Sequence, residues 1–304
     1  MQHNKNLYAP RFWLIWIGLF ILKCLVLLPY PLLIRIGKFI GRILLSSAPR
    51  WRKTARTNIR HCFPEYSADR QKELLLHNFE AVGISILESA LAMWGKDTNL
   101  KGLLHVKGEA YLLEAIKQQK PIILLGVHFT TTEIIGRLIS THHSLAVMYH
   151  QTKNPVVGKF REEHLKKHYK QAIPRSKMRE MIRCLENMIP VWYSPDVDPG
   201  SKQGIFAPFF GLPACTVSTV PRLAARTNAI VIPTAYYRRD DEQGYDLIFY
   251  PPLEKFPSSN LEEDVGKINQ IIEEAIRKKP EQYMWQYKRF KTPLPGTTDI
   301  YAKD

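Results

Sequence analysis

The sequence predicts an α/β fold, in which a central mixed sheet is flanked by helices and lies behind an N-terminal membrane-anchor helix. From about residue 104 onward, short apolar runs alternate with amphipathic segments, which is typical of strands and helices that follow one another along a chain. Near the N-terminus, residues 12–34 carry only one charge, Lys23. A composition of 45% hydrophobic and 23% charged residues over 304 positions is typical of a folded protein.

Residues 12–34, FWLIWIGLFILKCLVLLPYPLLI, are the predicted anchor. About 20 apolar residues suffice to cross a bilayer, and Pro29 and Pro31 are expected to end or kink the helix near residue 28. A full span and a shallow interfacial helix are both open, with a buried core helix as a third interpretation. Basic residues follow the stretch, and by the positive-inside rule they place the rest of the chain in the cytoplasm. We therefore expect an anchor at 1–34 and one domain at 35–304.

The remaining elements follow from periodicity. Residues 36–63 are a basic amphipathic stretch suited to anionic head groups, and Ser67 is expected to cap a long helix over 68–94. Strands are predicted at LLHV (103–106), PIILLGV (121–127), SLAVMY (144–149), IPVWYS (189–194), AIVIPTAYY (229–237) and YDLIFY (245–250). Helices are predicted near 108–118, 132–141, 155–170, 176–187, 217–228 and 262–278.

The net charge of +15 indicates a polyanionic partner, which leaves nucleic acid, anionic lipid, a phosphorylated substrate or an acidic protein open. The four cysteines are scattered without a CxxC pair, which argues against a zinc site or a disulfide framework and fits a reducing compartment.

The segment GVHFTTTEIIG (126–136) directly follows a predicted strand. His128 therefore falls at the carboxyl end of a buried strand, where open α/β sheets place their ligands. The residues alone leave two interpretations open. Thr130 and Glu133 match a capping box, in which Thr130 caps the next helix and Glu133 reaches back to its amide. Alternatively, His128 in the loop and Glu133 in the first helical turn converge as a catalytic pair.

HFTTTE resembles the HX4D/E motif of glycerolipid-type acyltransferases. Five more segments, in order and spacing, resemble the lipid A biosynthesis late acyltransferases of Gram-negative inner membranes. They are NIRHCFPE (58–65), YHQTKNP (149–155), VWYSPDVDPG (191–200), GIFAPFFGLPA (204–214) and YMWQYKRFKT (283–292). The resemblance covers nearly the whole chain, and an ordered set of this kind is far more specific than a lone HX4E.

The resemblance implies transfer of a fatty acyl chain from acyl-carrier protein to a hydroxyl of a 3-hydroxyacyl chain on a Kdo-bearing lipid A precursor. A secondary alcohol is a poor nucleophile, so a base must take its proton as it attacks the thioester. His128 is the expected base, and Glu133 is expected to hold the imidazole in the right tautomer. Such direct transfer needs no cofactor and no metal. A hydroxyl or amide near the FTT turn is expected to stabilise the oxyanion.

Further candidate substrate-binding residues lie in the matching segments. Asp196 and Asp198 occupy a Pro/Gly turn, where turn chemistry and a place near the acceptor are both open. Arg175 and Arg179 stand at family arginine positions and either contact phosphates or face solvent. Arg289 keeps the family pattern within the basic cluster YKRFKT (287–292), which either is a solvated basic face or contacts lipid phosphates. The paired phenylalanines of GIFAPFFGLPA are either core residues or the lining of an acyl channel.

The chain departs from the family pattern at three places. YKR (287–289) stands where members have His-Arg-Arg, YH (149–150) where they have Tyr-Arg, and HL (164–165) where many have Gly-Arg. Arg161 lies one helical turn earlier on the same face and is expected to stand in for the last arginine. These departures leave the reaction class unchanged and put the details of the acceptor in doubt.

No metal is expected, because the two aspartates lack a third ligand at suitable spacing. The histidines in the middle of the chain are interpreted as surface residues without ligand spacing, namely His142, His143, His150, His164 and His168. The expected partners are acyl-acyl-carrier protein, a phosphorylated lipid A precursor and membrane phospholipids, at the cytoplasmic side of a bacterial inner membrane. A different lipid acceptor remains an alternative. A non-catalytic nucleic-acid-binding role is a weaker one, because no nucleic-acid motif is present and no nucleic acid is expected.

Overall fold

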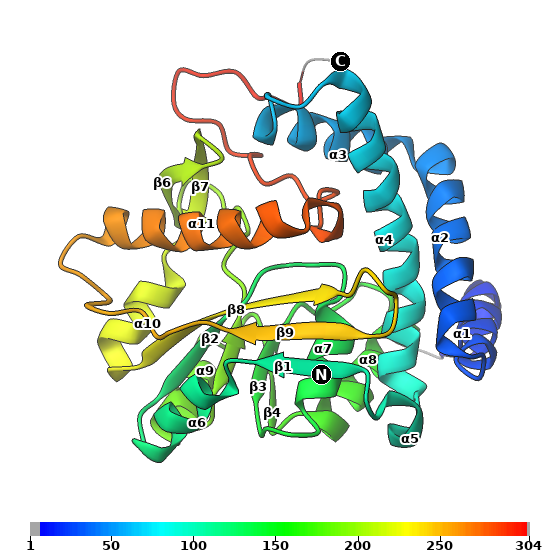
Figure 1. Cartoon of the computed structure of the whole chain (residues 1–304), viewed down its shortest axis with the longest axis horizontal. Helices are drawn as coiled ribbons and strands as arrows, with labels where there is room; N and C mark the ends of the chain where they lie inside the picture. Colours follow the sequence, from blue (N-terminus) through cyan, green and yellow to red (C-terminus); the bar gives the residue numbers. More distant parts are fainter. Residues whose placement is uncertain (1–6, 303–304) are drawn as a thin grey trace.

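A seven-stranded sheet lies at the centre of the computed structural model, which describes residues 7–302 (Figure 1). Its strands follow the order β1-β9-β8-β2-β5-β3-β4. They are β1 (Leu104–Lys107), β2 (Ile122–Leu125), β3 (Ala146–Tyr149), β4 (Gln171–Pro174), β5 (Val191–Tyr193), β8 (Ile230–Arg238) and β9 (Tyr245–Phe249). The predicted α/β class with a mixed central sheet is confirmed.

The site-forming half of this sheet is parallel. Strand β2 pairs in parallel with β5 and β8, and β3 pairs in parallel with β5 and β4, whereas β8 and β9 are antiparallel. The sequence IILL of β2 is buried along its whole length, as expected of a strand with helices on both faces. Because parallel strands end at one edge, the loops after β2, β5, β3 and β4 come together there.

Helices cover the sheet on both sides. They are α6 (Glu109–Lys117), α7 (Thr132–Ile139), α8 (Pro155–His168), α9 (Met178–Glu186), α10 (Thr219–Thr227) and α11 (Leu261–Lys278). In Figure 1, α11 lies above the sheet, and α6 and α9 lie below it. Each of these helices begins and ends within two residues of its predicted range. The apolar periodicity was thus sufficient to locate them.

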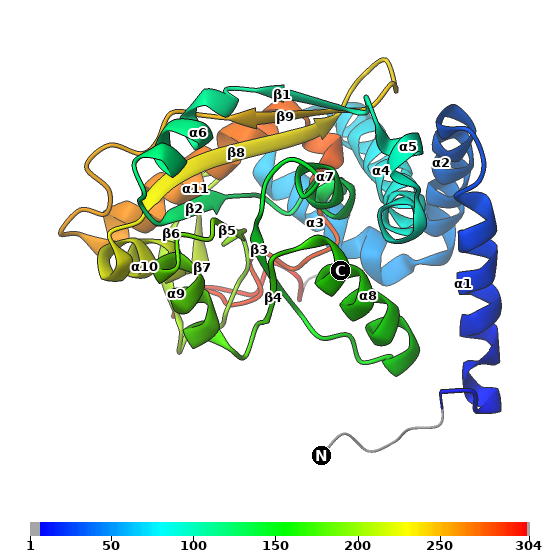
Figure 2. The same ribbon diagram turned by 90° about the horizontal axis from the view of Figure 1, so that it is seen from below.

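The long helix α4 (Ala68–Trp94) closes one end of the sheet, and α2 (Tyr30–Ser47) packs along its outer side (Figures 1 and 2). The Ser67 hydroxyl caps α4 by accepting a hydrogen bond from the Arg70 amide at 3.3 Å. Glycines allow close contact between the helices, because a Cβ on Gly83 would lie 2.1 Å from the Gly37 oxygen. Within residues 7–302, α4 is the one helix long and apolar enough to cross a membrane, yet 72% of that apolar window is buried. We interpret α4 as a core helix.

The apolar N-terminal stretch forms two helices. A 3-10 turn, η1 (Pro10–Phe12), leads into α1 (Trp13–Leu25), and α2 begins at Tyr30. The first helix therefore ends just before the prolines, as predicted. The boundary expected at residue 34 falls inside α2, where Leu33 and Ile34 are buried against the rest of the domain. Helix α3 (Pro49–Cys62) follows, and α5 (Asp97–Leu100) and η2 (Pro280–Gln282) are short.

Two features were not predicted, namely strand β4 and a separate hairpin of β6 (Gly204–Phe209) and β7 (Leu212–Val217). The hairpin is the segment GIFAPFFGLPA with three following residues. Its turn places Phe210 and Gly211 at φ values of 52° and 73°. Phe209 and Phe210 are buried and pack on one another in a T-shaped arrangement. They contribute to the core and are not part of the cavity described below.

Candidate active site

His128 lies in the loop between β2 and α7, at the carboxyl edge of the sheet. The loop after the neighbouring strand β5 carries Asp196. A backbone hydrogen bond from the Gly126 amide to the Tyr193 oxygen, at 3.0 Å, extends the pairing of these two strands beyond their ends. The parallel pairing therefore brings together two residues that are 68 positions apart in the sequence.

Asp196 fixes both the ring and the backbone of His128. One carboxylate oxygen, Oδ1, lies 2.6 Å from the imidazole Nδ1, and the other, Oδ2, accepts the His128 amide at 3.0 Å. The aspartate side chain is fully buried, whereas 45% of the His128 side chain is exposed. With Nδ1–H donated to the carboxylate, Nε2 is left as the free, proton-accepting nitrogen.

The electrostatics of this pair are coupled. Burial opposes the charged imidazolium, but the Asp196 carboxylate and, more weakly, Glu133 outweigh it and raise the pKa of His128 above its ordinary value. Burial likewise opposes ionisation of Asp196, yet the charge and hydrogen bonds of His128 lower the pKa of that carboxyl. The arrangement thus makes His128 a stronger base than a free imidazole.

Glu133 has a different partner from the one expected. Its Oε1 lies 2.5 Å from Nη2 of Arg161 on α8. The role of holding the imidazole tautomer, which the sequence assigned to Glu133, falls to Asp196 in the structure. The acid of the HX4E motif influences His128 through its charge alone and holds an arginine beside it.

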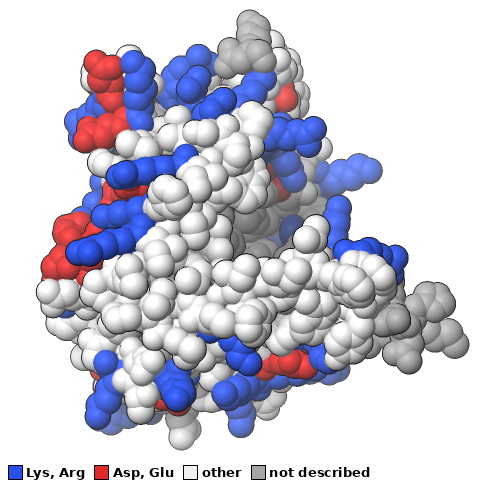
Figure 3. Space-filling model, turned by 90° about the vertical axis from the view of Figure 1, so that its right-hand side faces the viewer, with Lys and Arg blue, Asp and Glu red and all other residues white. Residues whose placement is uncertain are grey.

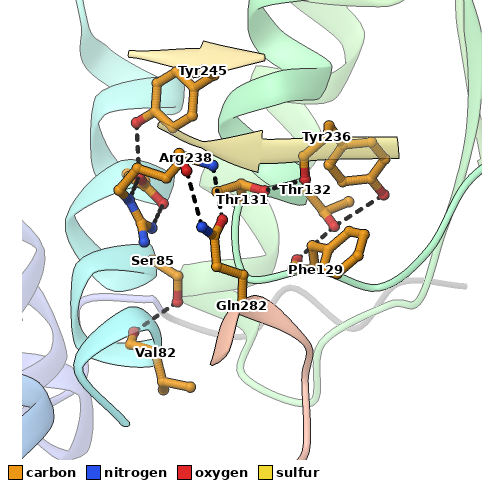
Figure 4. A network of polar contacts seen from close by, with 10 residues as sticks. Val82, Ser85, Phe129, Thr131, Thr132, Tyr236, Arg238, Tyr245 and Gln282 are labelled. Carbon is orange, nitrogen blue, oxygen red and sulfur yellow. Dashed lines mark hydrogen bonds and ion pairs between the residues drawn. The ribbon is translucent and has the colours of Figure 1, made fainter. Parts of the chain in front are cut away.

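The capping box at Thr130, one of the two interpretations left open, is not formed. Helix α7 has Thr131 as its N-cap residue, without a side-chain capping bond, and the buried Thr130 hydroxyl has no hydrogen-bond partner among the described residues. The loop is fixed differently, because the Thr132 hydroxyl donates to the Phe129 oxygen at 2.6 Å. The Tyr236 hydroxyl of β8 donates to the Val127 oxygen. It also lies 3.3 Å from the Thr132 hydroxyl (Figure 4).

A C-terminal segment, residues 281–286, holds this loop from the other side. The Thr130 amide donates to the Gln282 oxygen at 2.7 Å, and the Met284 amide donates to the His128 oxygen at 3.1 Å. Helix α4 in turn fixes the segment, because Asn78 Nδ2 donates to two of its carbonyls at 2.9 Å and 2.7 Å. The segment, which overlaps the C-terminal motif YMWQYKRFKT (283–292), therefore acts as a support for the His128 loop.

A buried polar network anchors the support (Figure 4). The side-chain amide of Gln282 pairs with the backbone of Arg238. Its Oε1 accepts the Arg238 N–H at 2.8 Å, and its Nε2 donates to the Arg238 oxygen at 2.9 Å. The Arg238 guanidinium donates to both oxygens of Glu88 at 2.8 Å and 2.7 Å, and Glu88 also accepts from the Tyr245 hydroxyl at 2.7 Å. All four side chains are buried, so removing one member would leave uncompensated polar groups. Sequence reasoning missed this network.

His128 faces a cavity of about 560 Å³, which is bounded by α4, α7, α8 and the carboxyl edge of the sheet. Cavities of roughly 300–1,000 Å³ are usual for small-molecule sites. Five predicted site residues line it, namely His128, Glu133, Arg161, Arg175 and Asp196. Apolar side chains such as Leu165, Val147 and Met148 form much of the remaining wall. The lining suits a substrate with a hydrocarbon part and a polar head.

Arg289, expected at a phosphate, and Asp198, for which a turn and a place near the acceptor were both open, do not line the cavity. The Arg289 guanidinium is buried, donates to the Cys215 oxygen and the Thr216 hydroxyl at 2.9 Å and 2.6 Å, and stacks on Phe209. It anchors the hairpin and has no access to a phosphate. The buried Asp198 carboxylate binds the Thr292 amide and hydroxyl, each at 2.8 Å, and closes a turn.

The other candidates divide between the cavity and the surface. Arg175, which follows β4, is exposed at the cavity, whereas Arg179 is exposed on α9 and does not line it. The surface interpretation was wrong for His164, because that side chain is buried; burial and nearby arginines lower its pKa to about 4. Among residues 7–302, no group of three or more His, Cys, Asp or Glu residues is arranged to hold a metal ion.

An imidazole oriented by a buried carboxylate, and facing a cavity with apolar walls, is suited to removing a proton from a bound hydroxyl. The fold and the site together define a group-transfer enzyme for a substrate with apolar parts. The comparisons with known proteins agree with this class and narrow it. Residues 1–292 match the bacterial lipid A biosynthesis acyltransferases, so the chain belongs to that family and is an acyltransferase.

Three relatives illustrate the extent of the match. The chain is 31% identical over 301 residues to a lipid A biosynthesis lauroyltransferase of Escherichia coli K12, covering 99% of this chain and 98% of the relative. It is 33% identical over 305 residues to a lipid A biosynthesis acyltransferase of Haemophilus influenzae, covering 99% and 97%. It is 31% identical to a lipid A biosynthesis palmitoleoyltransferase of E. coli K12, again over nearly the full length of both proteins. The similarity therefore extends from the N-terminal helices to the C-terminal support.

Proposed function

We propose that the protein transfers a fatty acyl chain from acyl-carrier protein to a hydroxyl of a 3-hydroxyacyl chain on a Kdo-bearing lipid A precursor. The observation that carries this proposal is the His128–Asp196 pair, whose free imidazole nitrogen faces a partly apolar cavity of about 560 Å³. The family membership supports a lipid A precursor as acceptor. The acidic carrier protein and the phosphorylated acceptor both fit a chain with a net charge of +15.

In the proposed step, His128 Nε2 accepts the proton of the acceptor hydroxyl as its oxygen attacks the thioester carbonyl carbon. The carbon–oxygen bond forms, the oxyanion collapses, and the carbon–sulfur bond breaks. The proton then passes from the imidazolium to the leaving thiolate. Asp196 stabilises the imidazolium and keeps Nε2 directed at the substrate. Glu133 adds negative charge near the ring and holds Arg161 in the cavity wall, where the guanidinium faces the polar part of the substrate.

We place the protein at the bacterial inner membrane, with the catalytic domain on the cytoplasmic side. Support comes from the basic residues that follow the apolar stretch and from the reducing environment that the free cysteines indicate. Another membrane lipid as acceptor is the second candidate. The departures from the family pattern at YH (149–150) favour it, because His150 and Tyr149 line the cavity.

Replacing His128 by alanine tests the mechanism. Loss of a general base costs about 10²–10⁴-fold in rate, so His128→Ala is expected to lose most transfer activity while it stays folded. His142→Ala is a matched control, because His142 is an exposed histidine that does not line the cavity, and it is expected to keep wild-type transfer. Glu133→Ala is also expected to lose most activity. Near-normal transfer by His128→Ala would refute the assignment of the base.

The acceptor is tested separately. The purified protein is offered acyl-carrier-protein thioesters with a Kdo-bearing lipid A precursor, a lysophospholipid or an ornithine lipid. Mass spectrometry of lipid A from cells with and without the protein then identifies the chain and its position. A missing acyl chain in the deletion strain is the expected result. If lipid A is unchanged in the deletion strain and the purified protein acylates another lipid, that lipid is the acceptor. The assignment as an acyltransferase would then still hold.

A further inference from the structure

Helix α1 exposes an apolar face that no described part of the chain covers. The exposed fraction is 60% for Trp13, 83% for Leu14 and 67% for Phe20. Ile17 and Ile21 continue the same face at 55% and 51%. Apolar side chains repeated at three- and four-residue intervals form one stripe on a helix. Contiguous exposed apolar surface of this kind marks an interaction site with a protein or a membrane.

The opposite flank of α1 is fastened to the catalytic domain. Trp16 meets Phe160 of α8 edge-on, with ring centroids 5.6 Å apart, and Phe160 meets Trp94 of α4 in the same way at 5.9 Å. Helices α4 and α8 also provide walls of the His128 cavity, through Ser85, Ser89 and Arg161 among others. The exposed stripe of α1 is therefore held at a fixed position beside the site.

The length of α1 is too short for a membrane span. Its 13 residues extend about 20 Å at 1.5 Å per residue, whereas the hydrocarbon core of a bilayer is about 30 Å thick. To cross the bilayer, the helix would also have to give up the aromatic contacts with α8 and α4. A helix that lies along one face of the bilayer keeps those contacts and buries the stripe.

The next two helices continue the surface and add positive charge. Leu32, Phe39 and Ile43 of α2 and Trp51 of α3 are at least 41% exposed. Eleven Lys and Arg residues occur among residues 1–64, where there is no Asp or Glu. Exposed basic side chains lie close to the apolar ones in sequence, namely Arg11, Lys23, Arg35, Arg42, Arg50 and Arg56. This combination is complementary to an anionic bilayer, with acyl chains beneath phosphates.

The surface on this side of the molecule is hollowed. In Figure 3, which shows the side that carries α1 and α2, a broad uncharged band crosses the molecule below a hollow that Lys and Arg side chains border. Helices α4 and α8, to which α1 is fastened, supply part of the wall of the His128 cavity.

We propose that α1 and the outward faces of α2 and α3 form a single-leaflet membrane-insertion surface, which holds the cavity of His128 open toward the lipids of that leaflet. Helix α1 lies along the interface, its apolar stripe reaches the acyl chains, and the basic residues contact phosphates. A lipid acceptor then enters from the side without leaving the bilayer. This last step rests on the proposed function, whereas the insertion surface does not.

Topology gives the first test. In full-length Cys24→Ser protein, the remaining native cysteines are buried. A single cysteine is introduced as Gln2→Cys or Asp304→Cys and is labelled with a membrane-impermeant maleimide. Both positions are expected to react in inverted inner-membrane vesicles and not in intact spheroplasts. Reaction of Gln2→Cys in spheroplasts would show that the N-terminal segment crosses the membrane and would overturn the proposal.

The second test measures binding to vesicles of phosphatidylcholine with about one third phosphatidylglycerol. The double variant Ile17→Glu, Phe20→Glu is expected to bind at least ten times more weakly while its circular dichroism stays unchanged. Leu113→Glu is the matched control, because Leu113 is 51% exposed on α6. Equal loss of binding in the control, or none in the double variant, would refute the insertion surface.

A transfer assay with two forms of the acceptor tests the insertion surface independently of the proposed function. With a detergent-dispersed acceptor, the double variant is expected to keep wild-type transfer, and with acceptor in vesicles it is expected to lose transfer at least tenfold. Equal transfer from vesicles by both proteins would refute lateral access. If the wild type transfers nothing while topology and vesicle binding are as expected, the proposed function fails and the insertion surface stands.

Discussion

At the level of single residues, the site depends on one hydrogen-bonded pair. Both carboxylate oxygens of Asp196 form hydrogen bonds with His128, one with the ring and one with the backbone amide. Its charge and hydrogen bonds raise the pKa of His128 against the effect of burial. The ring is therefore both oriented and made more basic by a residue that sequence analysis considered only for substrate binding or a turn.

Asp196→Asn is expected to lower the pKa of His128, because burial then acts without the opposing carboxylate. Transfer needs the neutral imidazole, so the wild-type rate falls as pH drops through the raised pKa of His128. In the variant this acidic limb moves to lower pH, and the maximal rate falls because the imidazolium loses its stabilising charge. A pH profile of kcat/KM measures both effects.

The pH profile of Glu133→Gln is compared with that of Asp196→Asn. Glu133 also raises the pKa of His128, but only by its charge, since the ring nitrogen bonds Asp196. The acidic limb is therefore expected to move in the same direction by a smaller amount. An acidic limb in Asp196→Asn that coincides with the wild-type one would contradict the assigned role of Asp196.

At the level of elements, the His128 loop depends on a segment from the far end of the chain. Residues 281–286 pair with the loop on one side and with Asn78 of α4 on the other. The side chain of Gln282 attaches the segment to β8 through the backbone of Arg238. This explains in physical terms why a motif distant from the catalytic histidine belongs to the same site.

Gln282→Met is expected to lower the free energy of unfolding by about 2–6 kcal/mol, because it leaves two buried backbone groups unpaired at about 1–3 kcal/mol each. Thermal and urea unfolding measure this. Well below the melting temperature, kcat is expected to fall more than KM changes, since Gln282 does not line the cavity. Gln270→Met, at an exposed glutamine of α11, is the control and should change neither quantity. An unchanged kcat in folded Gln282→Met would show that the loop does not need this support.

At the level of the whole molecule, the positive charge is unevenly distributed. The first 64 residues carry eleven basic residues and no acidic one, and the net charge of the chain is +15. Helices α4 and α8, which wall part of the cavity, contact α1 in this basic region. A membrane, a phosphorylated acceptor and an acidic donor protein would thus meet the same electrostatic field.

Because of this field, we expect the effect of salt on KM to differ between a charged and an uncharged acyl donor. Raising the ionic strength from about 0.1 M to about 1 M shortens the Debye length from about 10 Å to about 3 Å. The KM for acyl-carrier-protein thioester is expected to rise several-fold over this range, whereas transfer from a small uncharged thioester changes little. Steady-state kinetics with both donors, using a detergent-dispersed acceptor, measure the difference. Equal salt effects would argue against electrostatic docking of the donor.

The sequence by itself determined what local patterns encode. Periodicity located α4 and the six helices that flank the sheet to within two residues, the apolar stretch and its prolines indicated where α1 ends, and ordered motifs indicated the family. It did not divide residues 36–63, which belong to α2 and α3. It missed β4 and the β6–β7 hairpin, because short strands without clear alternation resemble loops and core segments.

Only the tertiary structure decided which residues meet. Asp196 reaches His128 because β2 and β5 are adjacent in the sheet, a pairing that no spacing along the chain reveals. Glu133, five residues from His128, instead turns to Arg161 of α8. Arg289, expected at a phosphate, is buried beneath the hairpin, since burial depends on the packing of distant elements. The sequence thus indicated the family and the candidate base, and the packing of the sheet selected the partner of that histidine.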